Sequence, residues 1–541
     1  MKPFLLFKDR DFDREEALPW QAGPLVQDLE LDTLFKAMAA QDGFLLEVVR
    51  KVILASLEDE EAILYRQEVL QDCLSHPELV RELYALAVDT IESEKNNHWG
   101  LLMGYPDTVL RRSVEVLTMF VSRLRKLRTI AEKQAAGFKS VGFQSFFAMV
   151  RAELDADYFA EIQYHLRQLK LNDGVLMSAE LQTGNKGGNY VLRKPLNTDR
   201  SWLRRLFIKG PPVLTYHLHP RDEQGARALS ELQDRGVNLV ANALAQSNDH
   251  ILSFFTQLRT ELAFYLGCQN LHERLARIGE PVCFPIASGV GRDRQSGEQL
   301  YDVCLAVNIG RPVIGNDLHA EGKNLVVITG ANQGGKSTFL RAVGLAQLMM
   351  QAGMFVAATT FQADVAHGVF THFKREEDTT MKSGKLDEEL ARMSEIVDRL
   401  GSGSLVLFNE SFAATNEREG SEIARQVVGA LTETGIKVYF VTHLFEFAHG
   451  LYERNLRNAM FLRAERREDG ARTFKLSESA PLQTSFGQDL YSRIFEGTAH
   501  KEVSGISHDK AEAMTPRAAP AWEEYDHADT TTSRASPHLH R

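Results

Sequence analysis

The sequence lacks any long hydrophobic run. None of its apolar stretches approaches the ~18 residues that a membrane-spanning helix requires. Near the N-terminus, acidic residues appear before the apolar core of an export signal could form, in MKPFLLFKDRDFDREE. We therefore expect no membrane span and no export, and we predict a cytoplasmic protein.

Cysteine is also scarce. The four thiols, Cys73, Cys268, Cys283 and Cys304, are widely spaced and form no C-x-x-C pair. This spacing argues against a zinc site and against a disulfide framework, so we expect reduced and mostly buried thiols.

An excess of positive charge is missing as well. With 62 basic and 73 acidic residues the formal net charge is −11, which argues against a protein that coats nucleic acid indiscriminately. That total averages over the whole chain and leaves room for a local basic surface. The length of 541 residues suggests roughly two to four domains.

The strongest motif lies in NLVVITGANQGGKSTFL, from Asn324 to Leu340. An apolar run predicts a buried strand that stops at Gly330, and the pattern turns helical after the loop. Between them the chain fits G-x-x-x-x-G-K-S in the strand, loop, helix context of a phosphate-binding loop. In such a loop backbone N–H groups converge on phosphate oxygens, while Lys336 supplies charge and Ser337 can bind Mg²⁺. The motif predicts ATP or GTP binding. The predicted nucleotide-binding residues are Gly330, Ala331, Asn332, Gln333, Gly334, Gly335, Lys336, Ser337 and Thr338.

The N-terminal half has a helical pattern. After an irregular acidic arm at residues 1–28, the helical period is almost continuous to about residue 171 and returns from about 226 to 278. A Gly-rich turn cluster predicts an interrupting loop or hairpin near 183–210. We therefore predict an all-α domain over 29–280. The second tract carries an apolar seam at heptad spacing: Ile251, Phe255, Leu258, Leu262 and Tyr265.

Two basic segments lie within this helical half. Residues 111–133 hold seven basic side chains against two acidic ones, and residues 193–209 interleave basic side chains with Trp202 and Phe207. Both segments are compatible with contacts to a nucleic-acid backbone. A solvated helix face, or an amphipathic segment that packs a Trp, would look the same. The candidate DNA-contact residues are Arg123, Arg125, Lys126, Arg204 and Arg205.

The composition changes near Glu280, where proline, glycine and polar residues mark a boundary. Strands and helices then alternate, which predicts a mostly parallel sheet with helices on both faces over 281–499. Residues 500–541 are poor in aliphatic side chains, and we predict a disordered tail. The segments predicted to be strands read YDVCLAV, LVVIT, MFVAA, SLVLF, VYFVTH and NAMFLRA.

Two of these strands end in polar residues. The strand SLVLF ends at Asn409 and Glu410, where a P-loop ATPase needs its Mg²⁺ ligand and the group that orients the attacking water. The strand VYFV ends at His443, in the place of a switch residue that senses the γ-phosphate. Open α/β sheets bind ligands at the carboxyl ends of their strands. We therefore predict Glu410 and His443 as catalytic residues and Ser337 and Asn409 as metal ligands.

Together these motifs resemble the MutS family of DNA mismatch-repair ATPases. The resemblance rests on TGANQGGKST, VLFNESFAATNEREG, VTHLFEF and TSFGQDL, which are similar to the family's phosphate loop, second nucleotide motif, switch histidine and Ser-aromatic-Gly element. It implies an α/β P-loop ATPase domain preceded by an all-α core and lever domain. It also implies ATP and Mg²⁺ as cofactors, and a homodimer that uses nucleotide state to clamp DNA in mismatch repair or related repair and recombination.

The resemblance assigns roles to further residues. Asn316 and Asp317 resemble the family's entry to the ATPase core. Ser383, Gly384 and Lys385 lie where the family has a signature loop that reaches the nucleotide of the partner subunit. The residues that contact the nucleotide base and the protein partners in repair are not indicated.

The sequence departs from the family in two respects. Asn409 replaces the usual Asp, so we expect weakened rather than abolished ATP hydrolysis. The core helices begin almost at once, so we expect no mismatch-reading domain, and we expect Phe159-Ala160-Glu161 to be core packing. An alternative function is an ABC-type ATPase or nucleotide-binding scaffold that acts on a protein partner without DNA. A nucleotide-binding regulator without turnover is a third.

Overall fold

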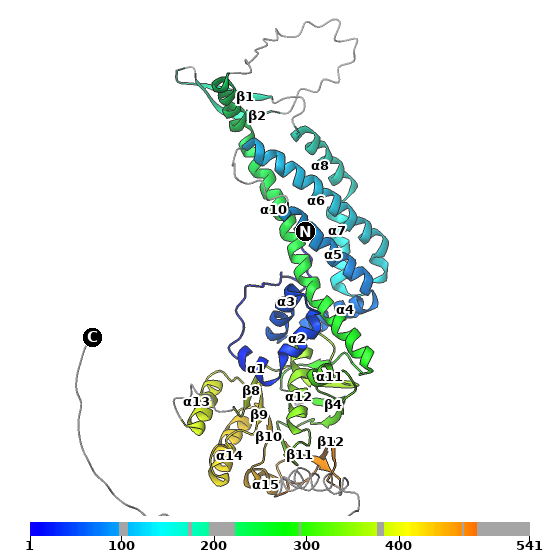
Figure 1. Ribbon diagram of the computed structural model, residues 1–541, viewed down its shortest axis with the longest axis vertical. Coiled ribbons are helices and arrows are strands. Elements are labelled where there is room, and N and C mark those ends of the chain that lie inside the picture. The colour runs from blue at the N-terminus through cyan, green and yellow to red at the C-terminus, as the bar shows by residue number, and fades with distance from the viewer. Residues whose placement is uncertain are drawn as a thin grey trace, which may run out of the picture. The chain divides into compact units, whose positions relative to one another are not determined.

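The computed structural model describes residues 1–96, 106–170, 176–184, 186–193, 222–291, 294–375, 384–467 and 470–483 (Figure 1). These residues belong to one compact unit, Met1–Ser485. A helical N-terminal part is followed by mixed α/β sheets, as the sequence predicts. The predicted tail at 500–541 and the candidates Arg204 and Arg205 lie outside the described residues.

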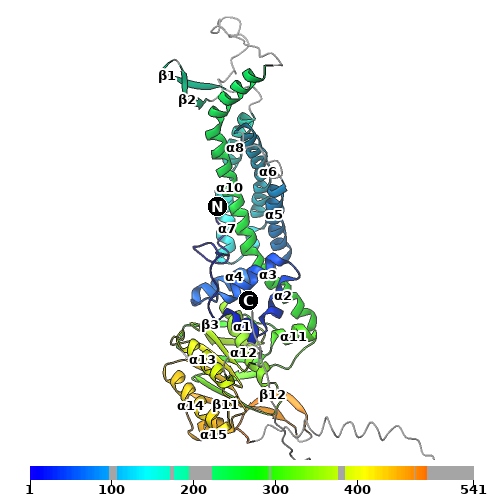
Figure 2. The ribbon, with the colours of Figure 1, turned by 60° about the vertical axis from the view of Figure 1, so that its left-hand side comes forward.

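The helical part is assembled around one long helix. Helix α10 packs along α5 and α6 (Figure 2), and all five residues of its predicted heptad seam are buried. The antiparallel hairpin of β1 and β2 precedes it in the chain. The elements of this part are α1 (Ala22–Asp28), α2 (Leu31–Ala39), α3 (Gly43–Leu54), α4 (Glu60–Ser75), α5 (Pro77–Asn96), α6 (Pro106–Gln134), the 3₁₀ turn η2 (Ala135–Gly137), α7 (Val141–Glu153), α8 (Ala156–Leu169), β1 (Met177–Gln182), β2 (Lys186–Leu192) and α10 (Glu223–Ile278).

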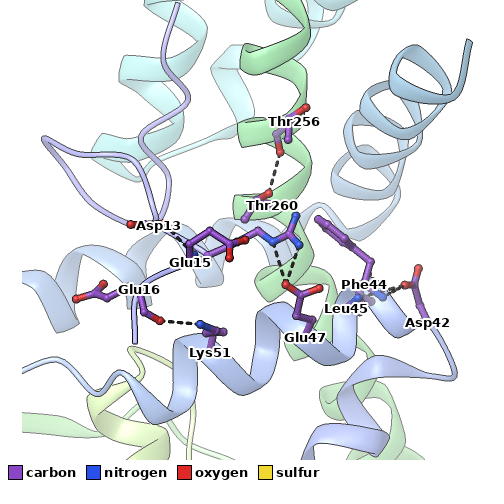
Figure 3. A network of polar contacts seen from close by, with 11 residues as sticks. Asp13, Glu15, Glu16, Asp42, Phe44, Leu45, Glu47, Lys51, Thr256 and Thr260 are labelled. Carbon is purple, nitrogen blue, oxygen red and sulfur yellow. Dashed lines mark hydrogen bonds and ion pairs between the residues drawn. The ribbon is translucent and has the colours of Figure 1, made fainter. Parts of the chain in front are cut away.

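The N-terminal segment is irregular until α1, yet it is packed against helices. Leu5 and Leu6 are buried, and the Leu5 N–H donates to the Glu261 carboxylate of α10 at 2.5 Å. Further along, Lys51 of α3 donates to the Glu16 carbonyl at 2.6 Å, and Arg14 pairs with Glu47 at 2.7 Å (Figure 3). Backbone polar groups that leave water need such partners, which explains the contacts along this segment.

Arg66 of α4 joins the helical part to the α/β part. Its side chain is only 2% exposed, and its guanidinium donates to the carbonyl of Leu6 at 3.3 Å and to that of Ala352 at 3.0 Å. Burial lowers the pKa of Arg66 to about 10, so the group stays charged at neutral pH. A buried charge of this kind depends on its hydrogen-bond partners.

The α/β part contains two sheets. The larger has the order β12-β11-β6-β10-β9-β8 and is parallel except for the β11–β12 pair; the smaller has the order β3-β7-β4-β5. The elements are β3 (Ile286–Ser288), β4 (Gln295–Leu300), α11 (Val303–Ile309), β5 (Asn316–His319), β6 (Leu325–Gly330), α12 (Lys336–Gln351), β7 (Thr360–Asp364), β8 (Val369–Phe373), α13 (Lys385–Val397), β9 (Leu405–Asn409), α14 (Glu417–Glu433), β10 (Lys437–Val441), α15 (Phe445–Glu453), β11 (Ala459–Arg466) and β12 (Arg472–Glu478).

Helices cover both faces of the larger sheet. In β6, alternate residues enter different cores: Val326 and Ile328 join the core that contains α12, whereas Val327 joins the core formed with α13, α14 and α15. This alternation explains why the strand is apolar throughout, since a strand buried on both faces has no solvent side.

Three features of this part differ from the predictions. The segment YDVCLAV is mostly helix α11, because Asp302 caps it by accepting from the Leu305 N–H at 3.0 Å. The segment MFVAA, residues 354–358, is buried but is not a strand, and only Val356 forms a β-bridge, with Cys283. The smaller sheet was not predicted at all. Among the described helices, none is both long and apolar enough to cross a membrane.

Candidate functional site

The predicted phosphate loop follows β6, which lies between β10 and β11 in the sheet. Two of its glycines are required by close packing: a Cβ at Gly330 would lie 2.8 Å from the Ala464 nitrogen, and one at Gly334 would lie 2.8 Å from the Ala331 carbonyl oxygen. Gly330 also has φ 111°, a conformation that favours glycine. The loop therefore folds tightly over the strand end, and α12 begins at Lys336 with its N-terminus facing the loop.

Lys336 lies across this loop. Its ammonium donates to the carbonyl oxygens of Gly330 at 3.1 Å and Ala331 at 3.0 Å, and the residue is only 5% exposed. Burial lowers the pKa of Lys336 to about 8, against the opposing influence of the Glu410 carboxylate. A positive charge is thus held where the motif would place the phosphates of a nucleotide.

Ser337 and Asn409 meet between the first turn of α12 and the end of β9. The Ser337 hydroxyl donates to the Asn409 amide oxygen at 2.8 Å. Both predicted metal ligands therefore present oxygen atoms to the same point, and oxygen is the donor that Mg²⁺ prefers.

Glu410 and His443 form the second polar pair. The imidazole Nε2 lies 2.9 Å from the Glu410 carboxylate, and the two residues follow the adjacent strands β9 and β10. The hydrogen bond from His443 lowers the pKa of Glu410 despite partial burial, and the charge of Lys336 acts in the same direction. The carboxylate is therefore ionised at neutral pH. The structure brings Lys336, Ser337, Asn409, Glu410 and His443 together at the carboxyl edge of three neighbouring strands.

The predicted signature loop is only partly described. Ser383 lies outside the described residues, Gly384 is exposed, and Lys385 begins α13. The role predicted for these three residues concerns a second subunit, and it stays a prediction.

The candidate DNA contacts on α6 differ in their surroundings. Arg123 pairs with Asp89 at 2.7 Å and Lys126 with Glu82 at 3.3 Å, whereas Arg125 lies over the Phe159 ring at 5.0 Å. Phe159 itself is buried, which confirms core packing for this residue, whereas Ala160 and Glu161 are exposed, so the prediction was wrong for them. Arg125 also lines a groove of about 460 Å³ between α6 and α8. The other residues that line it are Thr118, Val121, Ser122, Gln163, Leu166, Arg167 and Lys170.

A cleft beside the phosphate loop was missed by the sequence reasoning. It has a volume of about 520 Å³ and is bounded on the loop side by Gln333, Gly335 and Thr338. Its lining also includes the half-exposed apolar side chains of Ile314 and Phe474. Such a cleft can hold a flat aromatic group next to the phosphates. No local pattern indicates it, because its walls come from segments about 160 residues apart.

Strand β12 supports the loop. Arg472 donates to the carbonyl of Asn332 at 3.2 Å. Asn316, predicted as the entry to this region, donates to the carbonyl of Phe474 at 3.1 Å and accepts from the Leu476 N–H at 2.7 Å. These bonds fix β12 beside both the loop and the cleft.

Two family descriptions match the chain. The MutS2 N-terminal domain matches residues 58–278, and MutS domain V matches residues 326–494, a range that contains the phosphate loop, Asn409, Glu410 and His443. The chain belongs to the MutS family. The resemblance inferred from the nucleotide motifs is therefore confirmed.

Individual relatives share parts of the chain with this MutS-family protein. MutS protein homolog 4 of Mus musculus is 30% identical over 195 residues, which cover 35% of the chain and 20% of the relative. Endonuclease MutS2 of Streptococcus equi subsp. equi is 33% identical over 149 residues, 27% of the chain and 19% of the relative. DNA mismatch repair protein MutS of Parabacteroides distasonis is 23% identical over 475 residues, 82% of the chain and 50% of the relative. The match thus spans a fifth to a half of the length of these relatives.

Proposed function

We propose that this MutS-family protein is an ATPase that binds ATP with Mg²⁺ at the phosphate loop and uses the nucleotide to control DNA binding in repair. The observation that supports the proposal is the convergence of Lys336, Ser337, Asn409, Glu410 and His443 at one edge of the sheet. A phosphoryl-transfer site needs these components: a cradle with a cation, metal ligands, and a group that orients water.

Each residue has a distinct role in this proposal. The loop N–H groups and Lys336 hold the β- and γ-phosphates. Glu410, ionised and hydrogen-bonded to His443, orients the attacking water as general base, and His443 responds to the γ-phosphate through that bond. The cleft between Ile314 and Phe474 receives the adenine.

The residues present fit a magnesium ion. Ser337 would hold it directly, and the Asn409 oxygen would accept from water bound to it, because Mg²⁺ usually keeps several of its waters. The ion supplies charge that offsets the charge developing on the phosphates. Since Asn409 is neutral, the protein contributes less negative charge to this metal site than an aspartate would, and we infer slow turnover.

The DNA-related part of the proposal is supported by two relatives, a DNA mismatch repair protein MutS and an endonuclease MutS2. We infer a homodimer in which Ser383 or Lys385 completes the partner's nucleotide site, with the all-α region 29–280 and the ATPase region 281–499 as its working domains. The shared 149 residues cover only 19% of the endonuclease relative, so its nuclease activity is not carried over.

Two single-residue variants test the proposal, with ATP binding, ATP hydrolysis and DNA binding measured for each. Lys336→Ala should weaken ATP binding in calorimetry and remove nucleotide-dependent changes in DNA binding. Glu410→Gln should retain ATP while hydrolysis falls by roughly 10²-fold or more. Parental hydrolysis by Glu410→Gln would contradict its role. A failure to bind homoduplex, mismatched, branched or single-stranded DNA at low salt would favour the alternative, an ATPase or scaffold for a protein partner.

A further inference from the structure

The turn that carries Glu410 has an unusual backbone. Glu410 has φ 56° and Phe412 has φ 62°, so two residues that are not glycine adopt left-handed conformations within three positions. Such residues are strained and persist only where the surroundings fix them. The turn must therefore be held by contacts outside itself.

The first anchor is Glu389 of α13. Its carboxylate Oε2 accepts from the Phe412 N–H at 2.8 Å, at the second strained residue. Glu389 is 1% exposed, and its other oxygen, Oε1, has no hydrogen-bond partner. Burying a carboxylate with one oxygen unsatisfied costs free energy; an apolar side chain would avoid that cost but would leave the Phe412 N–H without its acceptor. The position therefore carries an acceptor that core packing alone does not require.

The second anchor is His372 of β8. Its Nδ1 lies 2.8 Å from the Ser411 hydroxyl, which also reaches the His372 carbonyl oxygen at 2.5 Å. Its Nε2 lies 3.0 Å from the Glu389 carbonyl oxygen, so the imidazole connects the turn to α13. Burial lowers the pKa of His372 to about 3, which keeps the ring neutral. The Nε2–H then donates to the backbone carbonyl oxygen of Glu389, and the Ser411 hydroxyl proton is shared between Nδ1 and the backbone carbonyl oxygen of His372. The ring also stacks on Phe412 at 5.3 Å.

These anchors lie away from the nucleotide motif. In the sheet β8 is the edge strand beyond β9, so β9 and β10 separate it from β6. On the other side of the turn, the Glu410 N–H donates to the Val441 carbonyl at 2.9 Å, which fixes the start of the turn to β10. The turn is thus held between β10 at its first residue and α13 at its third.

We propose that Glu389 and His372 are positioning residues for ATP hydrolysis, which hold the Glu410–Phe412 turn in the conformation that directs Glu410 toward the phosphate loop. The inference rests on the proposed function of Glu410 as the water-orienting base. Both residues act through the turn: Glu389 binds the backbone N–H of Phe412, and His372 contacts the Ser411 hydroxyl and the Phe412 ring.

The test separates nucleotide binding from turnover. In Glu389→Ala we expect kcat to fall by roughly 10-fold to 10²-fold, because a displacement of about 1 Å at a catalytic group can cost that much. The KM for ATP should stay within about twofold, since the phosphate loop is intact. Glu389→Gln keeps an acceptor for the Phe412 N–H and should restore most of the parental kcat. His372→Phe keeps the ring stack on Phe412 but removes the two hydrogen bonds made by the imidazole nitrogens, and it should lower kcat in the same way.

A double variant links the effect to Glu410. If Glu389 acts through Glu410, adding Glu389→Ala to Glu410→Gln should lower kcat no further. A multiplicative loss in that background would overturn the proposal, as would parental kcat in both Glu389→Ala and His372→Phe. If Glu389→Ala does not fold, His372→Phe carries the same test. Parental hydrolysis by Glu410→Gln alone would instead remove the proposed role of Glu410, an outcome distinct from a failure of the anchors.

Discussion

The Ser337 hydroxyl donates a 2.8 Å hydrogen bond to the Asn409 amide oxygen, and this bond ties the first turn of α12 to the end of β9. In this orientation the amide oxygen, and not the amide nitrogen, faces Ser337. The neutral side chain at this position thus keeps the acceptor of an aspartate while it lacks the charge.

Restoring that charge should strengthen the metal site. A charged acceptor improves such a contact by ~1 kcal/mol over a neutral one. Asn409→Asp should therefore lower the Mg²⁺ concentration for half-maximal ATP hydrolysis by ~5-fold. Hydrolysis rates measured across a magnesium titration check this, with Asn409→Ala as the control that loses the acceptor and should need more Mg²⁺. An unchanged midpoint in Asn409→Asp would show that position 409 does not support the metal.

The pH dependence of ATP binding should report on Lys336. Because burial lowers its pKa to about 8, Lys336 loses its proton as the pH rises above that value, and ATP binds the protonated form better. ATP affinity should fall above pH 8, and binding there should take up a proton. Calorimetry at pH 8.5 in two buffers of different ionisation enthalpy detects that uptake, and Lys336→Met should abolish it.

Mixing two inactive variants tests the shared nucleotide site. If Lys385 completes the site of the partner, Lys336→Ala and Lys385→Ala should each have low hydrolysis. In a mixed dimer one of the two sites has both residues intact, so each mixed dimer should recover up to about half of the hydrolysis rate of a parental dimer, as expected for independent composite sites. Activity per chain should also rise with protein concentration. Full activity in a demonstrated monomer would argue against the composite site.

If the protein binds DNA as proposed, we expect the contacts at the groove between α6 and α8. Arg125, Arg167 and Lys170 line it together, whereas Arg123 is paired with Asp89. Arg167→Ala combined with Lys170→Ala should weaken DNA binding and reduce the slope of log K against log salt by up to about 2, one for each lost phosphate contact. Arg123→Ala is the matched control and should change the slope much less. Equal effects from both variants would mean that the groove is not a contact site.

Binding of DNA should show little preference for a G·T mismatch over matched duplex, because these cations suit phosphates and not base edges.

Glu261 makes the stability of the protein depend on pH. Burial raises its pKa from 4.5 to about 7, although the N–H groups of Leu5 and Leu6 donate to it. A raised pKa in the folded state stabilises the protein fully below about 4.5, and the contribution is lost as the pH rises through about 7. Compared with Glu261→Gln, the parental free energy of unfolding should fall by as much as ~3 kcal/mol between pH 5 and 8. Urea titrations of both proteins at both pH values measure the free energy of unfolding. The same change between pH 5 and 8 in the parental protein and in Glu261→Gln would contradict the expectation.

The sequence predicts those features whose cause is local. The apolar run Leu325–Gly330 indicates a strand because both faces of β6 are buried, and the seam of α10 is read directly from its heptad spacing. The helix at Val303–Ile309 could have been found from its cap, Asp302. The segment 354–358 is apolar because it is buried, and burial without pairing has no sequence pattern of its own.

Features made by distant segments could not be predicted. The cleft beside the loop joins Ile314 to Phe474, and the anchors of the Glu410 turn come from β8 and α13. A histidine in a strand and a glutamate in an amphipathic helix look ordinary in the sequence. The contact of His372 with the turn follows from the pairing order that places β8 next to β9, and the contact of Glu389 follows from the place of α13 beside the turn.

The buried guanidinium of Arg66 has a consequence for biosynthesis. One of its acceptors, the Ala352 carbonyl, lies 286 positions further along the chain and is made long after α4 has left the ribosome. Until then the guanidinium of Arg66 has the Leu6 carbonyl as an acceptor but lacks the second one. We expect a fragment that ends near residue 280 to depend on chaperones and to be cleaved readily by proteases. Native packing around Arg66 is then complete only after residue 352 has been made.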